Sequence, residues 1–136
     1  MPFQILLRSL EKPQEKSLDG DIEWICKSFG FYEKIDRDKT AASIFKELLK
    51  LMGKGEGLTS TQLGECVEVT RGAALNHLKR MVASGFVVRE GKKYMLRCSS
   101  LYRTVSEIHR DIDRIFEDIE QIAMEIDDRL GIRRRE

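Results

Sequence analysis

The C-terminal part of the chain carries the pattern that most constrains its fold. Residues 101–130 contain neither Gly nor Pro, and apolar side chains recur there at alternating steps of four and three residues. This seam is sustained for more than three heptads, which is typical of helices that pack along their length on other helices. It predicts one helix of about 45 Å, at 1.5 Å per residue. The seam consists of Leu101, Val105, Ile108, Ile112, Ile115, Ile119, Ile122 and Ile126.

A second column of residues widens the apolar face of this predicted helix. Tyr102, His109, Phe116, Ala123 and Leu130 follow each other at seven-residue steps beside the seam. The face therefore occupies about three positions in seven, more than a two-stranded seam needs. A helix of this length would also overhang a small domain. We predict that the seam and Phe116 form the contact between two copies of the chain, in a helical bundle that includes the N-terminal helix of the same chain or of its partner.

Charge divides the chain into three segments. Residues 38–99 carry 11 basic and 6 acidic side chains, whereas residues 1–37 and 100–136 are both mildly acidic. A basic segment between two acidic ones is expected when only that segment faces a polyanion. We predict an N-terminal segment and helix that support the dimer (1–37), a basic domain (38–99) and a helical dimerisation segment with a basic tail (100–136). The apolar runs are too short for a membrane span, and no signal peptide is evident, so we expect a cytoplasmic protein.

The sequence of the basic domain predicts helices followed by a hairpin. Apolar side chains recur at helical spacing over 39–52, and Thr59-x-x-Gln62 matches a capping box for a short helix through Cys66. Thr70 is an N-cap candidate for a third helix, which Gly85 ends in a left-handed conformation. Residues 86–89 and 93–97 then flank a turn at 90–92, as in a β-hairpin. Before this domain, residues 21–29 predict a helix, while residues 1–18 give an uncertain strand or helix.

The third helix carries small, amide and cationic side chains opposite its buried stripe. Small residues permit close approach to a DNA groove, Asn and Arg can bond adenine and guanine through two atoms, and cations near phosphates position the helix. We therefore expect it to enter the major groove of double-stranded DNA by its N-terminal half. The candidate contacts are Thr70, Arg71, Gly72, Ala73, Asn76, His77, Lys79 and Arg80.

The hairpin adds three cations at its tip, Arg89, Lys92 and Lys93. From Leu58 through Leu96 the sequence resembles the winged-helix regulators of the ArsR, MarR and GbsR type, most clearly in the stretch from Asn76 to Val88. The resemblance implies a recognition helix from Thr70 to Arg80, a wing from Arg89 to Lys93, and a homodimer that binds a near-palindromic site. The expected fold is thus mainly α with a small β-hairpin: a winged helix-turn-helix domain plus the long C-terminal dimerisation helix. The expected function is transcription regulation, as a repressor, with room for a small-molecule effector of unknown chemistry.

Other classes of function find less support. The basic face could instead serve an acidic protein, in a subunit of a transcription or repair assembly. The sequence lacks a Gly-rich phosphate loop, and its two histidines lie on separate predicted helices, so we expect neither an enzyme nor a cofactor. Metal-sensing members of the resembled family place paired cysteines before the recognition helix, where this chain has only Cys66. We therefore expect no metal site, and Cys66 is predicted to be buried beside Leu63 and Val67.

Overall fold

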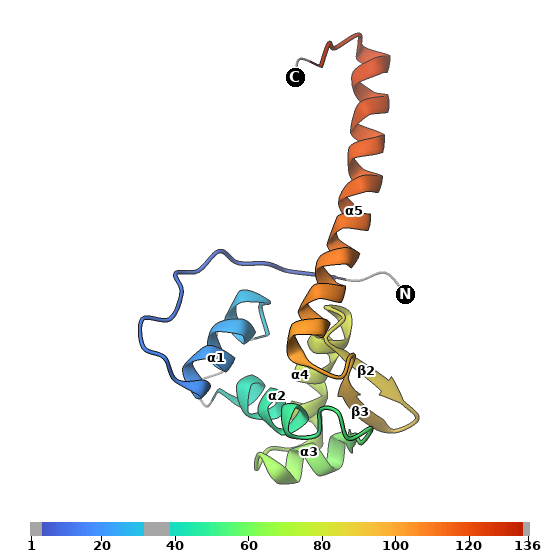
Figure 1. Ribbon diagram of the computed structural model, residues 1–136. Helices are drawn as coiled ribbons and strands as arrows, with labels where there is room; N and C mark the ends of the chain where they lie inside the picture. Colours follow the sequence, from blue (N-terminus) through green and yellow to red (C-terminus); the bar gives the residue numbers. More distant parts are fainter. Residues whose placement is uncertain (1–3, 32–38, 135–136) are drawn as a thin grey trace.

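The computed structural model describes residues 4–31 and 39–134, which form a compact body and one long helix that rises from it (Figure 1). The chain is mainly helical with a small antiparallel sheet and a long C-terminal helix, as the sequence predicted. The elements in chain order are α1 (Leu18–Ser28), α2 (Thr40–Lys50), β1 (Leu58–Thr59), α3 (Ser60–Cys66), α4 (Arg71–Ala83), β2 (Val87–Glu90), β3 (Lys93–Leu96) and α5 (Leu101–Leu130).

The structure confirms the predicted start of α3 and both predicted ends of α4, because the expected capping hydrogen bonds are present. The Thr59 hydroxyl accepts a hydrogen bond from the Gln62 amide at 3.1 Å, and the Gln62 side chain accepts one from the Thr59 amide at 2.9 Å. Thr70 caps α4 by accepting from the Ala73 amide at 3.1 Å. At the other end of α4, Gly85 has a φ of 88°. This left-handed residue lets the Phe86 amide donate back to the Met81 carbonyl at 3.1 Å, which turns the chain from helix into strand.

The sheet has three strands rather than the two of the predicted hairpin. Strand β3 lies between β1 and β2, and Leu58 pairs with Tyr94 on the additional side. A strand of two residues has no periodicity for a sequence pattern to reveal. Its consequence is structural, because it ties the start of α3 to the hairpin.

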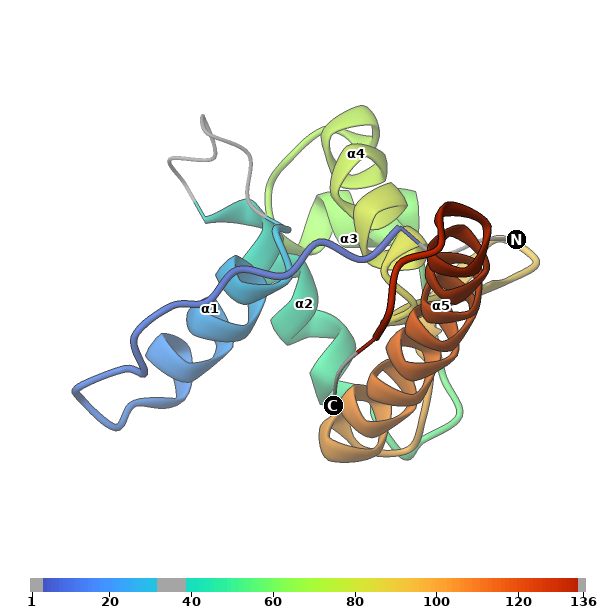
Figure 2. The ribbon, with the colours of Figure 1, turned by 90° about the horizontal axis from the view of Figure 1, so that it is seen from above.

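One hydrophobic core joins all three predicted segments. Phe86, at the start of the hairpin, meets Phe31 edge to face with ring centroids 5.2 Å apart, and meets Phe45 of α2 at 5.6 Å. Ile22 of α1 and Ile108 of α5 are buried in the same cluster. Helix α1 packs on α2 in this core and not on the rising part of α5 (Figure 2), so the chain's own N-terminal helix does not form the predicted bundle.

Residues 4–17, which precede α1, form neither helix nor strand. Backbone hydrogen bonds from Gln4 to the Ala83 carbonyl at 2.9 Å and from Arg8 to the Ser28 carbonyl at 2.8 Å hold this segment on the body. Trp24 donates its indole proton to the Glu11 carbonyl at 2.8 Å. The N-terminal segment therefore forms a stretch of the body surface close to α5 (Figure 2).

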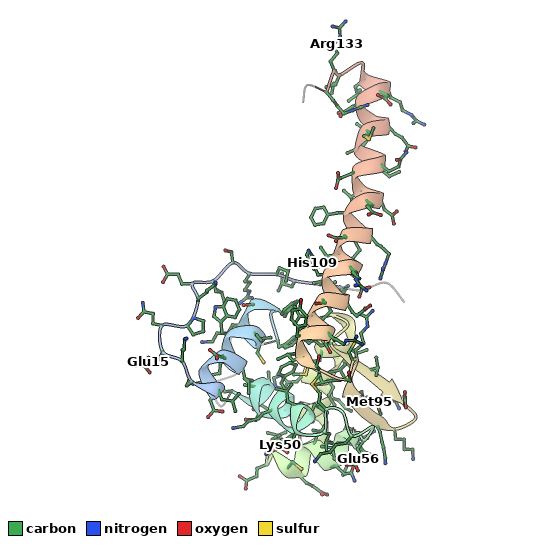
Figure 3. All side chains as sticks on the ribbon, viewed as in Figure 1. Glu15, Lys50, Glu56, Met95, His109 and Arg133 are labelled. Atoms are coloured by element: carbon green, nitrogen blue, oxygen red, sulfur yellow. The ribbon has the colours of Figure 1, made fainter. Side chains whose placement is uncertain are left out.

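Helix α5 spans the range that the sequence predicted, but its seam has two different environments. Ile108 is 1% exposed, and Leu101, Val105 and Ile112 pack against the same core. The predicted contact of Ile108 with a second copy is therefore wrong, because the body of the same chain buries this side chain, whereas Leu101, Val105 and Ile112 are only partly covered by that body. Beyond Ile112 the helix leaves the body. Ile115 and Phe116 still line a cavity against the N-terminal segment and α4, and the rest of the helix stands clear of the body (Figure 3).

A buried ion pair fastens α5 where it leaves the body. Asp111 is 2% exposed and accepts hydrogen bonds from Arg97, which follows β3, at 2.5 Å between Nη1 and Oδ2. Arg114, one turn further along α5, binds the same carboxylate. Hydrogen bonding to Asp111 raises the pKa of Arg97, so this guanidinium remains charged.

Candidate nucleic-acid interface

A basic groove runs between α4 and the hairpin. It has a volume of about 1020 Å³ and contains four cationic side chains but no carboxylate among the described residues that line it. We use the name basic groove for the space lined by Gln4, Thr59, Ser60, Thr61, Arg71, Leu75, Lys79, Val82, Ala83, Arg89, Lys92 and Tyr94. Uniform charge in a concave surface concentrates the field, which favours a polyanion over a neutral partner.

Local structure holds two of these cations in place. The Arg71 Nε donates to the Ser60 hydroxyl at 3.2 Å, so the first residue of α4 is anchored to the first residue of α3. The Arg89 Nε donates to the Gly91 carbonyl at 2.8 Å, and its guanidinium lies 5.6 Å from the centre of the Tyr94 ring. Lys79 and Lys92 are exposed and make no ion pair among the described residues. Two fixed and two mobile cations thus face one space.

The structure gathers only part of the predicted contact set in this groove. Arg71, Lys79, Arg89 and Lys92 line it. Thr70, Gly72, Asn76 and Lys93 are exposed but do not line it, and Ala73 is half-buried. Thr70 uses its hydroxyl as the helix cap. The residues that sequence reasoning missed include Ser60 and Thr61, whose place beside the hairpin depends on the pairing of β1 with β3.

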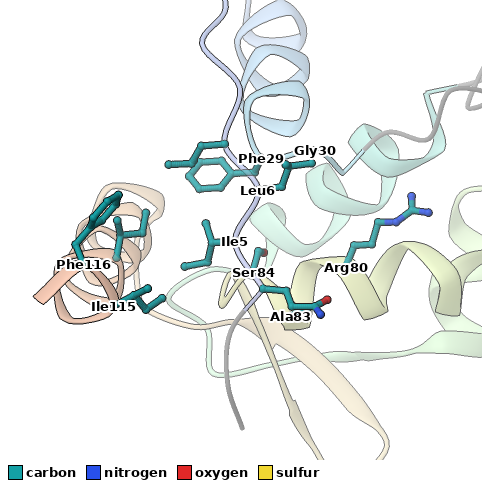
Figure 4. Close-up of a pocket in the computed structure, with 12 residues that line it drawn as sticks. Ile5, Leu6, Phe29, Gly30, Arg80, Ala83, Ser84, Ile115 and Phe116 are labelled. Atoms are coloured by element: carbon teal, nitrogen blue, oxygen red, sulfur yellow. The ribbon is translucent and has the colours of Figure 1, made fainter. Parts of the chain in front are cut away.

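Two predicted contacts point elsewhere. His77 is only 9% exposed, which excludes it from the outer face of α4, and its Nδ1 has no hydrogen-bond partner among the described residues. Arg80 is half-buried and lines a different cavity, beside the N-terminal segment and α5 (Figure 4). Helical phase predicts Arg80 on the outer face of α4 and His77 on its flank. Arg80 is partly covered because the N-terminal segment lies against the end of α4, where the Gln4 amide donates to the Ala83 carbonyl.

That second cavity is apolar. It lies between the N-terminal segment, the last turns of α4 and the part of α5 that leaves the body, and its volume is about 710 Å³ (Figure 4). We use the name apolar corner for the space lined by Gln4, Ile5, Leu6, Leu7, Phe29, Gly30, Arg80, Ala83, Ser84, Ile112, Ile115 and Phe116.

The cysteines and the acidic residues form no further site in the described part of the chain. Cys66 is exposed at the end of α3, so its predicted burial is wrong, whereas Cys26 is buried in the core. Residues 4–31 and 39–134 contain no group of three His, Cys, Asp or Glu side chains placed to hold a metal ion. None of the described helices combines the length and apolar character needed to cross a membrane.

Comparison with known proteins assigns no function to the chain, so the function proposed below rests on its sequence and structure. No protein-family model, no curated protein and no solved structure matches this chain.

Proposed function

We propose that the chain is a winged-helix protein that binds double-stranded DNA and regulates transcription as a homodimer. The observation that carries the proposal is the basic groove, in which four cations from α4 and the hairpin face one space without a carboxylate. In this interpretation α3 and α4 are a helix-turn-helix, α4 is the recognition helix, and β2 and β3 form the wing. The pairing of β1 with β3 supports it, because that pairing brings the start of the helix-turn-helix to the wing.

Each cation has a role that its position favours. Arg71, at the start of α4 and fixed by Ser60, is placed to contact the edge of a major groove together with the exposed amide of Asn76. Lys79 lies two turns further along the helix, where a cation meets the phosphate backbone and positions the helix without reading sequence. Arg89 and Lys92 on the wing would reach the next stretch of backbone or the minor groove.

The regulatory step is occlusion. A dimer that occupies its operator prevents other proteins from binding the same promoter, in proportion to the protein concentration and to its affinity for the site. Recognition helices of a two-fold dimer contact half-sites about 34 Å apart, one turn of DNA. The exposed second half of α5 supplies the surface for the second copy.

The test is selection of genomic fragments by the purified protein, followed by binding measurements across a salt series. We expect a few fragments to be retained, with an affinity that falls steeply as salt rises. Lys92→Gln should weaken binding to every sequence and reduce the salt slope by about 1, whereas Asn76→Ala should relax the preference among sequences.

The matched control for the wing variant is Lys50→Gln, which removes the same charge from the end of α2, outside the basic groove. It should leave both the affinity and the salt slope unchanged. Retention of no DNA at low salt would contradict the proposal and would favour an acidic protein as the partner of the basic groove.

A further inference from the structure

The second half of α5 and the N-terminal segment together form an unfilled apolar angle. Along α5 the four seam isoleucines beyond the body, at positions 115, 119, 122 and 126, are from 37% exposed at Ile115 to 57% exposed at Ile119. At the foot of the helix, Leu6 is 54% exposed and lines the apolar corner opposite Phe116 (Figure 4). We call the exposed seam of α5 from Ile115 to Ile126 the wall, and the exposed apolar side chains of the N-terminal segment, such as Leu6, the floor. Apolar side chains in contact with water on both indicate a surface that another element covers.

From this geometry we infer that a second copy of α5 packs antiparallel on the wall and that its tip closes the apolar corner. The inference rests on the dimer of the proposed function and specifies how the two copies meet. By two-fold symmetry, each tip covers the floor of the other copy, so each apolar corner is complete only in the dimer.

The position of the body excludes a parallel pair. The seam that faces the second copy also contains Ile108 and Ile112, which pack on the chain's own body. A heptad seam drifts by only about 20° per heptad on a straight helix, so the body lies on the seam side of the exposed half. The two-fold axis of a parallel pair runs along the seam and would pass through the body. The two bodies would then occupy the same space.

An antiparallel pair avoids this overlap. Its two-fold axis crosses α5 at a right angle between Ile119 and Ile122, so the bodies lie at opposite ends. Ile115 then faces Ile126 of the second copy, and Ile119 faces Ile122. From Asp113 to Leu130 the helix extends about 26 Å at 1.5 Å per residue. The tip, which is the C-terminal end of a helix that leaves one body, therefore reaches the other body.

The flanking positions are consistent with this arrangement. On one edge, the large ring of Phe116 meets the small Ala123 of the second copy, and large side chains pack well against small ones. The tip carries Arg129, Arg133 and Arg134. In the antiparallel pair the two sets of cations lie at opposite ends, whereas a parallel pair would place them beside each other, where like charges repel.

Disulfide trapping distinguishes the two orientations. The background carries Cys66→Ser and Cys98→Ser and keeps Cys26, which is fully buried. Ile115→Cys and Ile126→Cys are made as separate proteins, oxidised alone and then as an equal mixture. We expect a cross-linked dimer in the mixture and little in either protein alone. Cross-linking of Ile126→Cys to itself would overturn the antiparallel pair while leaving the dimer and its DNA binding in place.

Sedimentation of matched variants tests the covered surfaces. Ile122→Asp on the seam should convert the dimer to a monomer, whereas Met124→Asp, on the outer face of the same turn, should not. Leu6→Asp on the floor should raise the dissociation constant at least tenfold, and Leu18→Asp, which is exposed at the start of α1, should have no effect. All four side chains are exposed in the single copy, so circular dichroism should report an intact fold. An unchanged dimer in Leu6→Asp would show that the tip does not close the apolar corner, and a wild-type monomer at every concentration would contradict the dimer itself.

Discussion

Asp111 is a carboxylate almost without contact with solvent, and two arginines from different parts of the chain surround it. Arg97 comes from the end of the hairpin, and Arg114 from the next turn of α5. A buried carboxylate is tolerated only when it is paired, since an unpaired buried charge is strongly unfavourable. This cluster therefore fixes the angle between the hairpin and α5.

Asp111→Asn should destabilise the fold, because Arg97 and Arg114 lose the negative charge of the buried carboxylate that binds both of them. We expect a decrease of about 2 kcal/mol in the free energy of unfolding, measured by urea denaturation. Asp113→Asn is the matched control, since the Asp113 side chain is 62% exposed and has only His109 nearby at 3.8 Å. Its effect should stay within about 0.5 kcal/mol. Equal losses from the two substitutions would show that the buried cluster does not fasten α5.

At the scale of the element, α5 is one helix whose two halves have different environments. Its first half is part of the body, with Ile108 in the core, and its second half exposes an apolar face, which we propose as the surface for assembly. From Asp113 to Leu130 the exposed half carries seven acidic and two basic side chains. This charge keeps an apolar helix soluble before it meets its partner, but it opposes pairing wherever acids from both copies meet.

Asp118→Asn should strengthen the dimer. In the antiparallel pair Asp118 lies near Glu125 of the second copy, and the contact occurs twice by symmetry. Relief of two like-charge contacts of about 0.5 kcal/mol each should lower the dissociation constant roughly fivefold at low salt. The gain should shrink as salt screens the charges, as measured by sedimentation equilibrium at two ionic strengths. Glu120→Gln, on the side of the helix away from the seam, should give no gain, and an equal gain there would show that overall charge and not this contact matters.

At the scale of the whole molecule, one chain offers a basic groove and an apolar face on different elements. The groove lies between α4 and the hairpin, and the face lies on the half of α5 that leaves the body. The proposed dimer would therefore present two separate grooves. In that dimer, binding of one groove to DNA would raise the effective concentration of the other at the adjacent half-site.

Ile122→Asp should separate these two functions. We expect affinity for a fragment with two half-sites to fall by a factor of 100 or more, since the second contact is no longer linked to the first. Affinity for a fragment with one half-site should change by less than threefold, because the basic groove is intact. Fluorescence anisotropy with the two fragments measures both. A similar loss on both fragments would indicate that α5 acts on the groove itself and not through dimerisation.

Local patterns in the sequence determined the helices, their caps and the extent of α5. These features depend on neighbours along the chain: Thr59 with Gln62, Thr70 with Ala73, Gly85 with the end of α4, and the heptad repeat with itself. The hairpin follows from the same kind of local signal, because its strands flank a short turn at Gly91.

Only the tertiary structure decided which faces of these elements are covered. Helical phase placed Arg80 on the outside of α4 and His77 on its flank, but His77 is buried and the N-terminal segment partly covers Arg80. The heptad seam reads as one continuous surface, yet the body covers Leu101 to Ile112 and leaves Ile115 to Ile126 exposed. A periodic pattern records that a face is apolar. It does not record what covers that face, because the covering residues lie far away in the chain.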